Sequence, residues 1–166
     1  MKRIRLFSSR RSGFTLPELL VASALIGAVV ASALAIHLAQ QRAWRAAELQ
    51  MEVDHEVNMA IGRIVYGSGA RRGLRAANQA SLVHSGTNWT LTYVTSGTQT
   101  NTLQYQAGQS NIVYTPGNLL VAENISEAQA LFAPNLGTLA ITVRVDRVRG
   151  AFRARRQAGT VVRVRN

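Results

Sequence analysis

An uninterrupted apolar segment near the N-terminus limits most strongly what this chain can fold into. Residues 19–41 contain no Asp, Glu, Lys or Arg, and only His37 among them can titrate. As a helix that rises 1.5 Å per residue, this segment would be about 35 Å long, enough to cross a hydrocarbon core of roughly 30 Å. Apolar side chains occupy every face, and the small residues between them suit close packing against other helices. We expect residues 14–41 to form a transmembrane helix.

The residues before this segment predict its orientation. The leader, residues 1–13, carries five basic residues and no acidic one: Lys2, Arg3, Arg5, Arg10 and Arg11. By the positive-inside rule the leader stays in the cytoplasm, so the chain after residue 41 lies outside it. A secretory signal peptide is the alternative interpretation, with a cleavage site at residues 31–33. Its apolar core would span 7–15 residues, which is shorter than the segment seen here.

An acidic residue stands at the start of the apolar segment. At the bilayer centre a carboxylate costs roughly 2.5–3.5 kcal/mol even on lenient insertion scales. A plain membrane anchor has no use for Glu18 at this place. The carboxylate therefore predicts a dedicated partner.

Residues 13–20 read Gly-Phe-Thr-Leu-Pro-Glu-Leu-Leu. Together with the basic leader and the apolar segment, they resemble the N-terminus of the type IV pilin-like superfamily, which contains pilins and the pseudopilins of type II secretion systems. The resemblance implies that a prepilin peptidase cuts between Gly13 and Phe14 on the cytoplasmic side and methylates the new amine of Phe14. It also implies that Glu18 pairs with an N-terminal amine during assembly.

The resemblance covers only about the first 30 residues, and it includes one departure from the pattern. Major pilins commonly have a helix-kinking proline where this chain has Ala35. The departure weakens the case for a major pilin and is neutral for a minor pseudopilin. Separately, the globular half is loosely similar to the J or W type of minor subunit, with a helix after a long stem, a sheet, and the ending Val-Val-Arg-Val-Arg-Asn at residues 161–166. The partners implied are a prepilin peptidase, other pilin or pseudopilin subunits and an inner-membrane assembly platform. The implied location is the bacterial inner membrane, with one crossing and the C-terminal domain outside the cytoplasm.

Composition and motifs give no support for an enzyme, and the family resemblance implies a structural role. The chain has 19 basic and 8 acidic residues, and loss of the leader would leave 14 basic residues and a net charge of +6. There is no cysteine, so neither disulfides nor thiol chemistry contributes. The histidines (His37, His55 and His84) are scattered, which does not suit a zinc site. No nucleophile stands in a catalytic motif, and we expect no cofactor.

The helical pattern continues past the apolar segment but becomes amphipathic. Five apolar residues recur at spacings of three and four, which indicates one buried helix face: Leu49, Val53, Val57, Ala60 and Ile64. Beside them Glu48, Glu52 and Glu56 form a ridge of like charge. These carboxylates either face solvent or dock against a basic surface of this chain or of a neighbouring subunit. We assign this helix to residues 42–69, with residues 67–69 ending it.

The remaining residues, 70–166, predict a small β-rich domain. Alternating patterns indicate strands at residues 88–93, 103–105, 112–114, 119–122, 139–145 and 160–165. Residues 70–80 read as a basic loop or a frayed extension of the helix, residues 95–102 as a loop, and residues 147–156 as a basic connection between strands. Residues 134–137 read as a turn, and residues 125–132 are ambiguous. The predicted fold class is α+β, a long N-terminal helix packed on a mainly antiparallel sheet.

The arginines near the C-terminus are a second candidate site. Arg153, Arg155 and Arg156 could contact another subunit or a nucleic acid backbone, as in a DNA-uptake type of minor pilin. Phe152 is the single aromatic residue among the late arginines, so no stacking platform for bases is visible. Pairing with the glutamate ridge or with acidic lipid headgroups explains the same charge.

Overall fold

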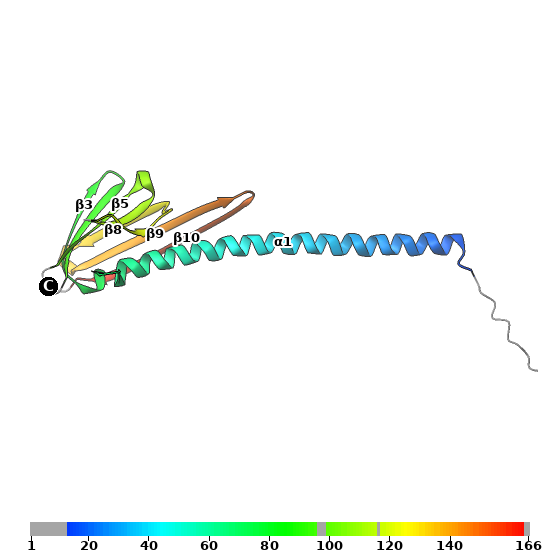
Figure 1. Ribbon diagram of the computed structural model, residues 1–166, viewed down its shortest axis with the longest axis horizontal. Coiled ribbons are helices and arrows are strands. Elements are labelled where there is room, and N and C mark those ends of the chain that lie inside the picture. Colours follow the sequence, from blue (N-terminus) through cyan, green and yellow to red (C-terminus); the bar gives the residue numbers. More distant parts are fainter. Residues whose placement is uncertain (1–12, 96–98, 116, 165–166) are drawn as a thin grey trace, which may run out of the picture. The chain divides into compact units, whose positions relative to one another are not determined.

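The computed structural model describes residues 13–95, 99–115 and 117–164 (Figure 1). The chain divides into two compact units after Ala43. One helix, α1 (Leu16–Tyr66), contributes its first part to the N-terminal unit and its last part to the C-terminal unit.

The N-terminal unit consists of the apolar part of α1. Among the described residues, α1 is the helix that is long and apolar enough to cross a membrane, judged by length and composition. Its large apolar side chains, Leu25 and Val29 among them, are exposed along the whole apolar segment. Exposed apolar side chains on every face suit a helix surrounded by lipid or by other apolar helices.

The C-terminal unit packs the amphipathic part of α1 on antiparallel sheets. The helix buries the five residues that its spacing predicted, from Leu49 to Ile64, so the sequence-based assignment of this face is confirmed. The inward residues of the strands complete the core, with Trp89, Tyr93, Tyr114 and Ile141 among them. The predicted α+β fold class is confirmed.

The strands form two main sheets rather than the one that was predicted. The larger has the order β3-β4-β5-β6-β7, with bounds Ala77–Ser85, Asn88–Thr95, Thr100–Gln106, Asn111–Thr115 and Leu119–Ala122. The smaller has the order β10-β9-β8, with bounds Phe152–Arg163, Thr138–Arg149 and Glu127–Ala133. Short 3-10 helices η1 (Leu74–Ala76), η2 (Ala107–Gln109) and η3 (Pro134–Leu136) connect strands.

Glycines end α1 and allow the chain to turn back on itself. Gly67 follows Tyr66 with φ +101°, a conformation that side chains disfavour. A two-stranded ribbon, β1 (Gly67–Ser68) with β2 (Arg71–Arg72), then forms. A Cβ on Gly73 would come within 2.4 Å of the Val65 carbonyl oxygen, so only glycine fits this crossing.

Three segments differ from the sequence-based prediction. Residues 77–80 and 100–102, which read as loops, belong to strands β3 and β5. The ambiguous residues 125–132 lie largely in β8. The basic connection, residues 147–156, is the end of a long hairpin in which only Gly150 and Ala151 form the turn. The arginines obscured the strand pattern, because the carboxylates that pair with Arg147 and Arg149 lie far away in the sequence, on α1.

Candidate functional site

The predicted processing residues, Gly13 and Phe14, lie immediately before α1. Gly13, Phe14 and Thr15 are not helical, and α1 begins at Leu16. The Phe14 side chain is 82% exposed, and no heavy atom lies within 4 Å of where a Cβ on Gly13 would stand. The Gly13–Phe14 peptide bond is thus outside the helix in an open segment. A protease that binds its substrate in an extended form can reach such a bond.

Thr15 and Glu18 close the first turn of α1. The Thr15 amide donates to Glu18 Oε2 at 2.9 Å, and the Thr15 hydroxyl donates to the same oxygen at 3.0 Å. The Thr15 carbonyl accepts from the Leu19 amide at 3.1 Å. A threonine followed three positions later by glutamate is the pattern of a capping box, in which the glutamate accepts from the N-cap amide. The sequence analysis noted Glu18 and missed Thr15, although this pattern was available to find it.

Two of the three ridge glutamates, Glu52 and Glu56, face arginines of the β9–β10 hairpin. Arg147 bridges them, with Nη1 3.0 Å from Glu52 Oε1 and Nη2 in contact with Glu56 Oε1. Arg149 Nη2 lies 3.1 Å from Glu52 Oε2. In Figure 1 the hairpin runs beside the last part of α1. Of the alternatives left open for the ridge, docking against a basic surface of the same chain is therefore the one observed for these two glutamates.

Each of the three candidate contact arginines lies near a carboxylate. Arg153 Nη2 and Arg155 Nε are 3.8 and 3.5 Å from Asp146, and Arg156 Nε is 3.6 Å from Asp54. Arg153 and Arg155 project from the outer face of the small sheet, whereas Arg156 faces the helix. The structure thus separates the three residues onto two faces and does not gather them into one patch.

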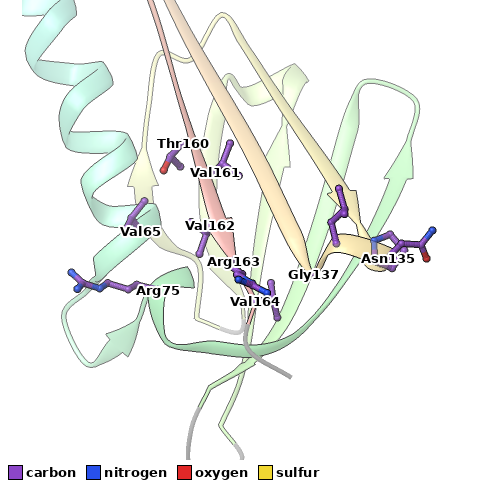
Figure 2. Close-up of a pocket in the computed structure, with 11 residues that line it drawn as sticks. Val65, Arg75, Asn135, Gly137, Thr160, Val161, Val162, Arg163 and Val164 are labelled. Carbon is purple, nitrogen blue, oxygen red and sulfur yellow. The ribbon is translucent and has the colours of Figure 1, made fainter.

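A cavity of about 900 Å³ lies near the C-terminal end of β10 (Figure 2). Val65 of α1 and Arg75 of η1 stand on one side of it, with residues 160–164 across from them. The guanidinium of Arg75 also stacks over the Tyr66 ring, 5.7 Å from its centroid. The described residues that line the cavity include the hydroxyl of Thr160 but no carboxylate, histidine or thiol. They therefore do not form a nucleophile–base pair.

Comparison with known proteins places the N-terminal segment in a family. Residues 8–34 match the family model described as the prokaryotic N-terminal methylation motif. Searches of curated proteins and of solved structures each found no match to the chain. The chain is pilin-like in joining this motif to a long helix packed on antiparallel sheets. The motif implies processing by a prepilin peptidase and a membrane-anchored protein of a typically non-enzymatic kind.

Proposed function

We propose that this chain is a minor subunit of a pilin-like filament, a minor pseudopilin of a type II secretion system or a minor pilin. A prepilin peptidase cuts it between Gly13 and Phe14 and methylates the Phe14 amine. The apolar part of α1 holds it in the bacterial inner membrane until an assembly platform moves it into the filament with other subunits. The C-terminal unit then lies outside the cytoplasm.

One observation carries this proposal: a methylation motif whose scissile bond lies in an open segment directly before a capped apolar helix. A cut there leaves a cation on Phe14 at the membrane edge, and Glu18 is the nearest carboxylate along the chain. In a medium of low dielectric constant, an amine and a carboxylate attract strongly, and each is unstable without the other. Pairing of Glu18 with an N-terminal amine would set the register between subunits.

The test is the intact mass of membrane-extracted protein, expressed with and without a prepilin peptidase. We expect loss of residues 1–13 and gain of one methyl group only when the peptidase is present. Gly13→Leu should block the cut, because its side chain obstructs the close approach of a protease to the backbone. An unprocessed wild-type chain, or a cut near Ala33, would overturn the proposal.

Glu18→Ala separates processing from assembly. We expect this variant to be cut and methylated but absent from filaments, because the register-setting carboxylate is gone. Ser23→Ala, a change at another polar residue of α1, should be processed and assembled. Normal assembly of Glu18→Ala would contradict the role given to Glu18.

A DNA-uptake role is the second candidate. It has support from the Arg153, Arg155 and Arg156 side chains, each more than half exposed. The nearby carboxylates and the separation onto two faces weaken it. DNA binding that falls steeply with salt and is lost on changing Arg153 and Arg155 would favour it.

A further inference from the structure

The turn of the β9–β10 hairpin lies beside the first residues of the C-terminal unit. A cavity of about 580 Å³ is lined by Arg45 and Leu49 of α1 and by residues 149–152 at the turn. The ion pair between Arg149 and Glu52 holds the hairpin in this place. The hairpin turn, taken as Gly150 and Ala151 with the two residues on either side (residues 148–153), therefore sits at the end of this unit where α1 enters it.

The sequence connects this end of the unit directly to the membrane helix. Trp44, the first residue of the unit, is three positions after Gln41, where the apolar segment ends. At 1.5 Å per residue, Arg45 is about 6 Å along the helix from that point. The headgroup layers add roughly 5–8 Å on each side of the hydrocarbon core. In the sequence, the helix residues that line the cavity with the turn thus follow the end of the apolar segment by four to eight positions.

The side chains exposed at this end have the composition of a membrane-interface contact. Trp44 is 73% exposed and Val148 69% exposed. The side chains of Arg149 and Arg153 are 62% and 68% exposed. Tryptophan is enriched at headgroup depth, and arginine next to a membrane binds anionic headgroups. By contrast, the more enclosed Arg147 is directed at the carboxylates of α1.

We propose that the hairpin turn, residues 148–153, binds the anionic phospholipid headgroups of the membrane that holds α1. Arg149 and Arg153 contact the phosphates, and Val148 and Trp44 reach the interface beside them. This contact orients the C-terminal unit before the subunit enters a filament, and it ends when α1 leaves the bilayer. The inference rests on the proposed function only in requiring that α1 spans a membrane.

The acidic residues around the turn set the expected strength of the contact. Glu48 also lines the cavity, Glu52 already pairs with Arg149, and Asp146 lies 3.8 Å from Arg153 Nη2. The local excess of positive charge is therefore small, and the contact should be reversible and sensitive to salt. Removing one arginine should weaken it on the order of fivefold.

The test places a probe at the turn of the full-length protein in lipid nanodiscs. The chain has no cysteine, so Ala151→Cys gives a single labelling site at an exposed turn residue. A fluorophore there is exposed to a quencher attached to lipid headgroups, in discs with and without phosphatidylglycerol. Gly108→Cys, at an open position of η2, serves as the distant reference site.

We expect strong quenching at residue 151 only in anionic discs, and little at residue 108 in either. Adding Arg149→Gln with Arg153→Gln, or raising the salt, should remove most of the quenching. Arg163→Gln, a charge change at the other end of β10, should leave it unchanged. Equal quenching in both kinds of disc would overturn the proposal. So would quenching at residue 151 that appears only when a second protein subunit is present.

The intact mass of the same samples separates this inference from the proposed function. A processed chain without quenching at residue 151 would refute the lipid contact and leave the filament role intact. An unprocessed chain with quenching that depends on anionic lipid would support the contact and refute the filament role.

Discussion

Arg147 and Glu52 lie 95 positions apart in the sequence, yet Nη1 of the arginine is 3.0 Å from Oε1 of the glutamate. The same guanidinium contacts Glu56, one helical turn further along α1. Two carboxylates at this spacing repel each other, and a cation between them removes the repulsion. This bridge fixes the β9–β10 hairpin to the helix.

Arg147→Met should destabilise the C-terminal unit by about 1–3 kcal/mol, because two partly enclosed carboxylates lose their charged hydrogen-bond donor. Arg155→Met is the matched control. Its side chain is more exposed and its distance to Asp146 longer, so it should change stability by less than about 1 kcal/mol. Urea unfolding of both variants in detergent measures the difference. Equal effects would show that the bridge adds nothing beyond a surface ion pair.

Trp89 connects the two main sheets through its side chain. Its indole Nε1 donates to the carbonyl oxygen of Ala128 in β8 at 3.0 Å. Trp89→Phe should lower the free energy of unfolding by about 1–3 kcal/mol or more, because it leaves that buried oxygen without a donor. Trp44→Phe, the same change at an exposed position, should stay within about 0.5 kcal/mol. A small effect at Trp89 would mean that water replaces the lost donor.

Two buried tyrosines should make the fold sensitive to alkali. Burial raises the pKa of both Tyr93 and Tyr114, whose hydroxyl oxygens are 3.4 Å apart. Above pH about 10 the unfolded chain loses these protons before the folded chain does. The unfolded state then binds fewer protons, so stability falls as pH rises, by at most about 1.4 kcal/mol per pH unit for each tyrosine.

Urea unfolding at a series of pH values above 10 measures this slope. Lys2 is the only lysine, and arginine stays charged in this range, so tyrosines dominate the titration. Tyr114→Phe removes one of the tyrosines whose pKa burial raises, a set that also includes Tyr105, and should make the slope shallower. The same slope in the variant and the wild type would contradict the assignment.

The capping contact at Thr15 should protect the first turn of α1. Thr15→Ala removes the hydroxyl that donates to Glu18 Oε2 and leaves the Thr15 amide as the remaining donor to that oxygen. The Leu19 amide, which donates to the Thr15 carbonyl, should then exchange with solvent faster. Hydrogen exchange followed by NMR in detergent tests this. Thr15→Ser should retain slow exchange, and unchanged exchange in Thr15→Ala would show that the backbone contact to Glu18 suffices.

The period of the apolar residues allowed much of the C-terminal unit to be predicted. Val53 and Val57 recur at helical spacing and are buried, and Leu91 and Tyr93 alternate with polar residues and point inward. Residues 77–80 were missed because the polar Asn78, Gln79 and Ser81 obscure the alternation of an edge strand. β3 becomes a strand by pairing with β4, a contact that its own composition does not indicate.

The arginine hairpin shows the same limit within a candidate site. Arg147 and Arg149 have the same parity along β9 as the buried Val143 and Val145, so the alternation does continue through them. Their charge argued for a loop, because an inward arginine is stable only opposite an acidic partner. That partner lies on α1, about 95 residues away, and no local pattern reveals it.

The sequence by itself determined the elements whose causes are local. The methylation motif, the apolar length of α1, its buried face and its end just before Gly67 all follow from neighbouring residues and their spacing. Only the tertiary structure decided which carboxylates the arginines meet, how the strands divide into two sheets, and which end of the C-terminal unit carries the hairpin turn. Those outcomes depend on ion pairs and hydrogen bonds between segments far apart in the chain. Such contacts produce no periodic pattern in the sequence of either segment.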